Sequence, residues 1–312
     1  MDYFVGTPRE FGELKNAYLA ITGEDCKVVL GLVKPNYFKV WISIALGHLG
    51  LLGPAIYFLA YDTFSTLPIQ FIKLSLVSMV IGFSFYYLSL FFHAASHYNL
   101  AISRPLNDML ARIFLAPLFG ADISTYRRVH FDHHKYLGAQ GDPENAYIQR
   151  LDAYFFGSAL IGITFLKKSI LNLASNADGK KNDKKKKSRM PLVSAALHTV
   201  IFFVTLVFSP TLALAWAIGF AIVFPLASDL RLILEHKVSA TQGVSTKVFQ
   251  GATSRLFGGA GFNYHLLHHW DPSLHYTCLA SVMNEFRRCG LIDSRWVVTT
   301  YSKEFIALFG RK

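Results

Sequence analysis

Four long apolar stretches limit what this chain of 312 residues can fold into. They cover residues 38–61, 68–92, 191–208 and 211–234. Each has about 20 mostly apolar residues, the length that an α-helix needs to cross the hydrocarbon core of a bilayer. Inside that core every backbone polar group must be paired within the protein, which favours helices. Together with a hydrophobic content of 52%, the stretches predict an all-α integral membrane protein with four transmembrane helices.

Short turns should join these helices into two hairpins. The turns, residues 61–67 and 209–210, contain no Lys or Arg, whereas the segments 93–190 and 235–312 carry most of the basic residues. The positive-inside rule therefore places both segments and both termini in the cytosol. We expect a single domain over residues 1–312, in which the two basic segments form a cytosolic helical cap.

The basic stretch 180–189 is the clearest candidate for a surface contact outside the apolar segments. Its lysines are not interleaved with aromatic residues, as a single-stranded nucleic-acid site would require. We expect a solvated loop that touches anionic lipid head groups, and no nucleic-acid partner. The three cysteines, Cys26, Cys278 and Cys289, form no spaced framework, which fits a reducing compartment.

Nine of the twelve histidines gather in three short motifs and one isolated position. His-x-x-x-His occurs at 93–97, the first motif. The pattern His-x-x-His-His occurs twice, at 130–134, the second motif, and at 265–269, the third motif. His236 stands between the two longer motifs. Residues three and four apart share one face of a helix, so each motif presents its rings in one direction. The nine positions are His93, His97, His130, His133, His134, His236, His265, His268 and His269.

These imidazoles indicate a centre with two metal ions. Neutral imidazole binds iron, zinc, copper and nickel, and a zinc site uses three or four protein ligands. Nine candidates exceed one such site and match two metals with four or five ligands each. Soluble di-iron bundles use Glu-x-x-His pairs, and this chain has none. Two irons held by histidines at a membrane surface are the better fit.

The motif spacing, the four apolar stretches and their common side resemble the membrane fatty acid desaturase family. These integral-membrane di-iron enzymes also include lipid hydroxylases and carotenoid oxygenases. The resemblance runs from about residue 92 to 276, together with the preceding helices, and extends to the local sequences at 126–130, 231–236 and 263–269. It implies that the nine histidines bind two irons, that O2 is the co-substrate, and that no catalytic residue beyond the metal ligands is assigned.

The resemblance also implies the reaction and its partners. The expected activity is O2-dependent desaturation of an acyl chain in a lipid. The alternatives are a lipid hydroxylase or other oxygenase of the same family and a non-catalytic metal-binding membrane protein. The chain lacks the His-Pro-Gly-Gly motif of a fused haem domain, so a separate ferredoxin- or cytochrome-type protein should supply electrons. The isolated-histidine segment resembles bacterial members, which favours the bacterial inner membrane over the endoplasmic reticulum.

One departure from the family concerns the substrate. Family members usually continue after the last motif with an apolar residue and Pro-x-x-Pro, whereas residues 270–276 read Trp-Asp-Pro-Ser-Leu-His-Tyr. The identity of the lipid therefore stays open.

Polar side chains near the motifs should orient the imidazoles, as is usual around metal ligands. The candidates are Asp132, Asp142, Glu144, Asp229, Arg231, Glu235 and Asn263. Two further histidines, His48 and His198, lie within apolar stretches and outside every motif. Although an ionisable residue in a membrane helix is a functional candidate, we expect both to be neutral and bonded to neighbouring helices.

The predicted orientation can be tested by cysteine labelling. Because the 61–67 turn has no basic residue, a cysteine introduced as Ser65→Cys should react with an impermeant maleimide only from outside the cell or from the lumen. Labelling from the cytosolic side alone would contradict the topology.

Overall fold

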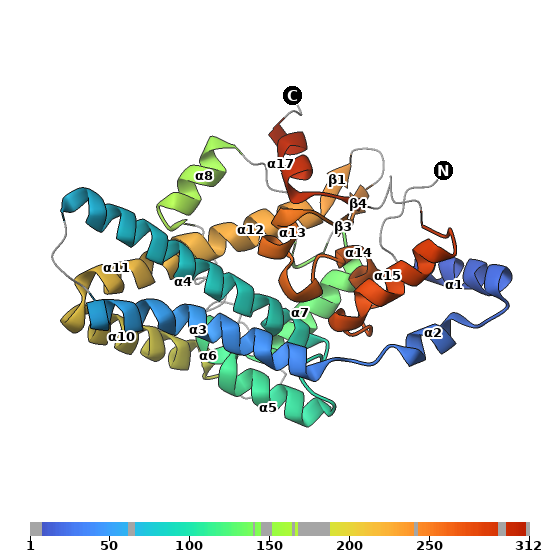
Figure 1. Ribbon diagram of the computed structural model, residues 1–312, viewed down its shortest axis with the longest axis horizontal. Helices are drawn as coiled ribbons and strands as arrows, with labels where there is room; N and C mark the ends of the chain where they lie inside the picture. Colours follow the sequence, from blue (N-terminus) through green and yellow to red (C-terminus); the bar gives the residue numbers. More distant parts are fainter. Residues whose placement is uncertain are drawn as a thin grey trace. The chain divides into compact units, whose positions relative to one another are not determined.

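The structure, a computed structural model, describes residues 8–61, 66–139, 141–144, 152–163, 166–167, 188–239, 243–292 and 298–309. Ser65 and most of the basic stretch 180–189 lie outside these residues. The described chain is mostly helical (Figure 1). It divides into two compact units. We call Ile42–Arg127 with Arg150–Ser228 the span unit, and Met1–Trp41 with Arg128–Gln149 and Asp229–Lys312 the histidine unit.

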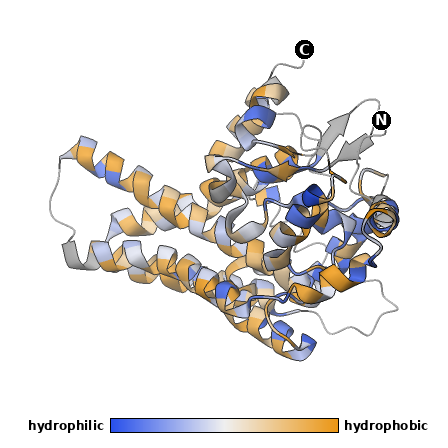
Figure 2. Ribbon diagram, turned by 45° about the vertical axis from the view of Figure 1, so that its right-hand side comes forward, coloured by the Kyte–Doolittle hydropathy of each residue, from blue (hydrophilic) through white to orange (hydrophobic). Residues whose placement is uncertain are grey.

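Four helices of the described chain are long and apolar enough to cross a membrane, as the sequence predicts. They comprise α3 (Tyr37–Tyr61), α4 (Leu67–Ser96), α10 (Met190–Phe208), and a composite of α11 (Pro210–Ile218), η2 (Gly219–Val223) and α12 (Phe224–Glu235). Figure 2 shows these helices coloured as hydrophobic along most of their length. On α10, Val200, Phe203 and Val207 are 59%, 58% and 80% exposed. Such a continuous apolar face fits a lipid environment.

The ends of these helices follow from local sequence. Ser209 ends α10 and caps α11, because its side chain accepts a hydrogen bond from the Leu212 amide at 3.2 Å. Pro210 then occupies the first turn, where its missing N–H costs nothing. Pro225 lies just after the π-helical segment η2. Since proline cannot donate a helical hydrogen bond, the wider turn before it is the expected local adjustment.

Two glycines allow α4 and η2 to approach each other closely in the span unit. A Cβ at Gly82 of α4 would lie 2.8 Å from the Gly219 carbonyl oxygen and would collide with Val223. A Cβ at Gly219 would lie 2.9 Å from the Ser78 carbonyl oxygen. Beside this contact, the buried ring of Phe85 packs 5.2 Å from Trp216 and 4.9 Å from Phe220. Aromatic residues of α4 thus serve helix packing.

His198 is a bonded histidine of the span unit. Its Nε2 lies 3.0 Å from the Leu118 carbonyl oxygen, and its Nδ1 accepts a hydrogen bond from Trp216 at 3.2 Å. Both ring nitrogens are satisfied in the neutral form. Leu118 belongs to α6 (Ala116–Phe119), which follows α5 (Arg104–Phe114). Helix α8 (Ala153–Leu160) completes the described helices that lie wholly in this unit.

The histidine unit contains shorter elements. They are α1 (Pro8–Thr22), α2 (Cys26–Leu32), most of α7 (Ile123–Tyr136), the end of α12, β1 (Lys237–Ser239), β2 (Gly243–Ser245), β3 (Val248–Phe249), α13 (Ala252–Phe257), η3 (Gly259–Gly261), α14 (His265–Trp270), η4 (Tyr276–Cys278), α15 (Leu279–Arg288), β4 (Val298–Thr299) and α17 (Tyr301–Phe309). Strands β1 and β2 pair antiparallel, and β3 and β4 pair parallel. These pairs correct the all-α expectation; strands of two or three residues leave no readable alternation in a sequence.

Aromatic side chains build the core of the histidine unit. Trp270, at the end of α14, stacks on Phe11 of α1 with ring centroids 6.1 Å apart. Phe11 also meets Phe286 of α15 edge-on. Elsewhere, Tyr301 of α17 stacks on Phe249 of β3 at 4.1 Å. The first of these contacts fastens α1 to α14, which carries the third motif, and the last fastens α17 to β3.

The glycine contact in the span unit gives a stability prediction. Gly82→Val should lower the thermal unfolding midpoint in detergent, because overpacking a tight contact costs about 1–3 kcal/mol. Gly157→Val is the matched control, since a Cβ at Gly157, in helix α8 of the same unit, has nothing within 4 Å. Equal midpoints for the two variants would contradict the close approach of α4 and η2.

Candidate metal centre

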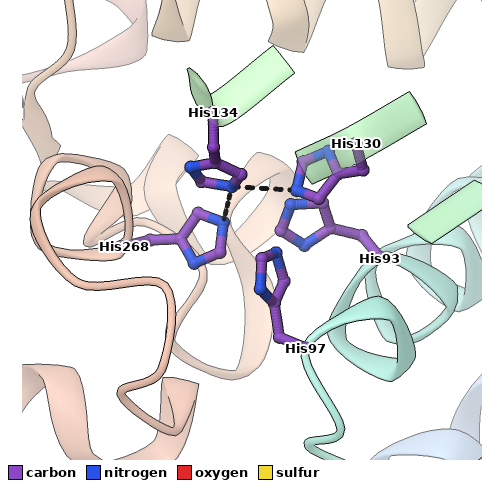
Figure 3. A group of neighbouring side chains, drawn as sticks. All are labelled: His93, His97, His130, His134 and His268. Carbon is purple, nitrogen blue, oxygen red and sulfur yellow. Dashed lines mark hydrogen bonds between the residues drawn. The ribbon is translucent and has the colours of Figure 1, made fainter. Parts of the chain in front are cut away.

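Helix α7 and helix α14 bring three histidines together in the histidine unit. His130 and His134 are one turn apart on α7, and their Nε2 atoms are 3.0 Å apart. The Nε2 of His268, on α14, lies 3.1 Å from that of His134. Figure 3 shows these rings pointing toward one another. The sequence separates the two helices widely, so their tertiary arrangement creates the group.

A second group of four histidines is centred on His236, which directly follows α12. Its Nε2 lies 3.0 Å from that of His265, 3.1 Å from that of His269 and 3.3 Å from that of His133. The Nε2 atoms of His265 and His269 are also 3.0 Å apart. All four side chains are buried. His236 therefore forms a single cluster with one histidine of the second motif, His133, and two of the third, His265 and His269.

Hydrogen bonds between neutral rings do not account for the contact of His133 with His236. A neutral imidazole carries one N–H. The Nδ1 of His236 lies 3.0 Å from the Leu232 carbonyl oxygen, and the Nδ1 of His133 lies 2.9 Å from the Asp142 carboxylate. In each neutral ring the proton therefore belongs on Nδ1, and the lone pairs of the two Nε2 atoms face each other. A shared cation would turn this repulsion into attraction.

The distances fit such a cation. With metal–nitrogen bonds of about 2.1 Å, two ligand nitrogens at right angles around one ion lie about 3.0 Å apart. The Nε2 separations in both groups are 3.0–3.3 Å. Donor sets made of imidazole suit iron, zinc, copper and nickel. The residues of each group therefore fit a transition-metal ion.

Burial prepares the second group for metal binding at neutral pH. Burial, with a smaller contribution from His133, lowers the pKa of His236 to about 3. Burial also lowers the pKa values of His265 and His269 well below the ordinary value. These rings are neutral at pH 7, the form that binds metal, so protons compete little with the ion.

Two carboxylates hold the rings of the second motif from behind. Asp142 accepts from Nδ1 of His133 at 2.9 Å, and Glu144 lies 3.2 Å from Nδ1 of His130. Both follow α7 in the short segment 141–144, and Asp142 is buried. By keeping a proton on Nδ1, each carboxylate directs the lone pair of Nε2 toward the centre of its group.

A third carboxylate, Glu235, supports His265. Its Oε2 lies 3.5 Å from Nδ1 of His265, while Arg231 donates to its Oε1 at 2.8 Å. Tyr301 of α17 also donates a hydrogen bond to Glu235. The sequence does not reveal the role of Tyr301, because this residue lies beyond the last motif and belongs to no pattern. Only the fold shows that the C-terminal helix reaches the centre.

The remaining candidates have other surroundings. Asp132 is exposed on α7, and among the described residues it makes no recorded hydrogen bond to a motif histidine. Asp229 is buried on α12. Asn263 donates from its amide to the Phe249 carbonyl oxygen at 2.8 Å, which fastens the chain before α14. Asn263 thus supports the backbone of the third motif.

The first motif lies in the span unit, within and just after the last turn of α4. Its two rings, those of His93 and His97, have centroids 5.4 Å apart, and their ligand nitrogens lie within 4.8 Å of each other (Figure 3). Helix α4 continues to Ser96, so His93 is inside the helix and His97 is its C-cap. The pair can bind one metal from one direction.

The extra histidine after the third motif has a structural environment. The Nδ1 of His275 accepts a hydrogen bond from the Thr277 amide at 3.2 Å and so caps η4. Its ring packs against Tyr276 and meets Tyr37 edge-on. These contacts account for the burial of a histidine that the sequence left outside the nine.

The apolar helices and the histidine clusters define a membrane protein with a candidate metal centre. The family model for fatty acid desaturases matches residues 72–299. This range is well over half of the chain and includes all three motifs, so the chain belongs to the fatty acid desaturase family. The predicted resemblance is confirmed. No curated protein matches the chain.

The carboxylate contacts give a prediction for metal affinity. Asp142→Ala should weaken metal binding about 10–100-fold, the usual effect of losing a partner that orients a metal ligand. Asp132→Ala, on the exposed face of α7, should bind normally. Metal titration of chelator-treated protein measures the difference, and equal affinities would show that the Asp142–His133 contact does not orient a ligand.

Proposed function

We propose that the chain is an O2-dependent di-iron desaturase that introduces a double bond into the acyl chain of a lipid. Membership of the fatty acid desaturase family supports this reaction class. The observation that carries the metal assignment is the convergence of imidazole Nε2 atoms in two groups. Two such groups match two irons, and the donors in both are imidazoles.

We assign the ligands by group. One iron would be held by His130, His134 and His268 together with the first-motif pair, His93 and His97. The other iron would be held by His133, His236, His265 and His269. This division uses every motif histidine once and gives one site of five ligands and one of four.

The arrangement in the membrane follows from charge. The four apolar helices form two hairpins, and the histidine motifs lie on the cytosolic side with the basic segments. A bacterial inner membrane is the proposed location. Transporters place their ligands near the middle of the membrane at helix breaks, whereas these motifs lie at helix ends, which argues against a non-catalytic transport function.

The chain's own residues would prepare the centre for chemistry on an alkyl chain. When bound, the irons supply the activation of O2 and the removal of hydrogen from an unactivated C–H bond. Asp142 and Glu144 retain the Nδ1 protons of their histidines, so the metal-binding nitrogens stay unprotonated. Apolar residues at the helix ends would hold the alkyl chain with one carbon nearest the centre, which sets regioselectivity. Electrons would come from a separate ferredoxin- or cytochrome-type protein.

Mass spectrometry of lipids distinguishes desaturation from hydroxylation. Lipids from cells that express the chain are compared with lipids from cells that express His268→Ala. A loss of about two mass units per acyl chain supports the proposal, because one hydrogen leaves each of two carbons. A gain of about sixteen would identify a hydroxylase of the same family, since both reactions use the same type of centre.

The isolated histidine gives the sharpest mutational prediction. His236→Ala should abolish turnover and lower the iron content from two per chain, because His236 is central to the four-histidine group. His198→Ala is the control: it removes a buried histidine from a membrane helix outside the groups and should keep most activity. Full activity and full iron content in His236→Ala would disprove its assignment as a ligand.

A further inference from the structure

The end of helix α4 depends on side chains from other helices. The last carbonyl groups of an α-helix have no partner within the helix. Here the Nε of Arg127 donates to the Ser96 carbonyl oxygen at 2.8 Å, and its Nη2 donates to the Ala95 carbonyl oxygen at 3.1 Å. The Asn107 amide also donates to Ala95, at 2.9 Å. A cation in this position also interacts favourably with the negative end of the helix dipole.

The guanidinium group of Arg127 is held in one orientation. Asp108 of α5 accepts hydrogen bonds from both of its terminal nitrogens, one of them at 3.1 Å. The group also lies over the ring of Tyr98, 3.9 Å from the centroid. Arg127 is buried. Its planar fork thus meets two carbonyl groups, a carboxylate and an aromatic face at once, which a lysine ammonium cannot do.

The position of Arg127 connects two histidine motifs along the chain. The carbonyl groups that it binds belong to the last turn of α4, and this turn lies between His93 and His97. Arg127 itself is on α7, three residues before His130. The side chain that fastens the first motif is therefore built into the helix that carries the second. The neighbouring Arg128 is exposed.

We propose that Arg127 is a positioning residue that sets the direction of His93 and His97 toward the metal they bind. The inference rests on the proposed di-iron function. It assigns to Arg127 the orientation of two of the five histidines in the five-ligand site. Without the guanidinium fork, the last turn of α4 would lose its two hydrogen bonds from Arg127, and the two rings would be held less firmly for the ion. The four-ligand site should be unaffected.

The test compares Arg127→Lys with Arg128→Lys in the full-length protein in detergent. Both variants keep the positive charge. Only Arg127→Lys removes the guanidinium group that binds the end of α4. Arg127→Lys should bind the iron of the five-ligand site about 10–100-fold more weakly, so it should hold fewer than two irons per chain and show a weaker spectroscopic signal of coupled irons. Its kcat should fall in proportion to the protein that keeps both irons, with KM nearly unchanged, because substrate binding is not altered. Arg128→Lys should match the wild type.

The outcomes separate this inference from the proposed function. Wild-type protein that binds no iron would contradict the di-iron function itself. Wild-type protein with two irons, together with Arg127→Lys that also has two irons and full kcat, would overturn the positioning role alone. If Arg127→Lys does not fold, Asp108→Asn tests the same point, since it frees the guanidinium but leaves Arg127 in place. Asp108→Asn should lower the iron content in part, and two irons with full kcat would overturn the inference.

Discussion

The mutual repulsion of imidazole lone pairs is the constraint on which the centre depends. In the four-histidine group, Nδ1 protons point outward to Asp142 and to the Leu232 carbonyl oxygen, so unprotonated nitrogens point inward. Burial keeps His236 neutral and removes the water that would otherwise satisfy these nitrogens. Unprotonated imidazole nitrogens are the atoms that bind a transition-metal ion. The helices that deliver the rings therefore place suitable donor atoms side by side.

The sequence predicted the parts of this arrangement that depend on long or repeated patterns. The four apolar stretches appear as membrane-length helices because lipid requires a continuous apolar run. The second motif lies on one helix, where the spacing of His130 and His134 brings their rings together, while His133 joins the other group. Glu144 and Glu235 stood out because they are near motif histidines. In each case a local pattern is sufficient, and no knowledge of tertiary structure is needed.

Other parts of the fold and of the candidate site depend on tertiary contacts that no sequence pattern predicts. Tyr301 reaches Glu235 only because α17 packs against β3 through the ring of Phe249. Asp132 was as good a candidate as Asp142 by sequence, but the helical periodicity of α7 exposes Asp132, while the turn after α7 brings Asp142 back to His133. The short strands were missed for the same reason. Sequence separation hides these contacts, and tertiary packing decides them.

The bond between Tyr301 and Glu235 has a consequence for biosynthesis. A ribosome makes the chain from the N-terminus, so α17 emerges after every histidine motif and after all four apolar helices have entered the membrane. Until then Glu235 lacks its tyrosine partner and α14 lacks the support of α17 through β3. The order of synthesis therefore means that the contacts around Glu235 are complete only after α17 has been made.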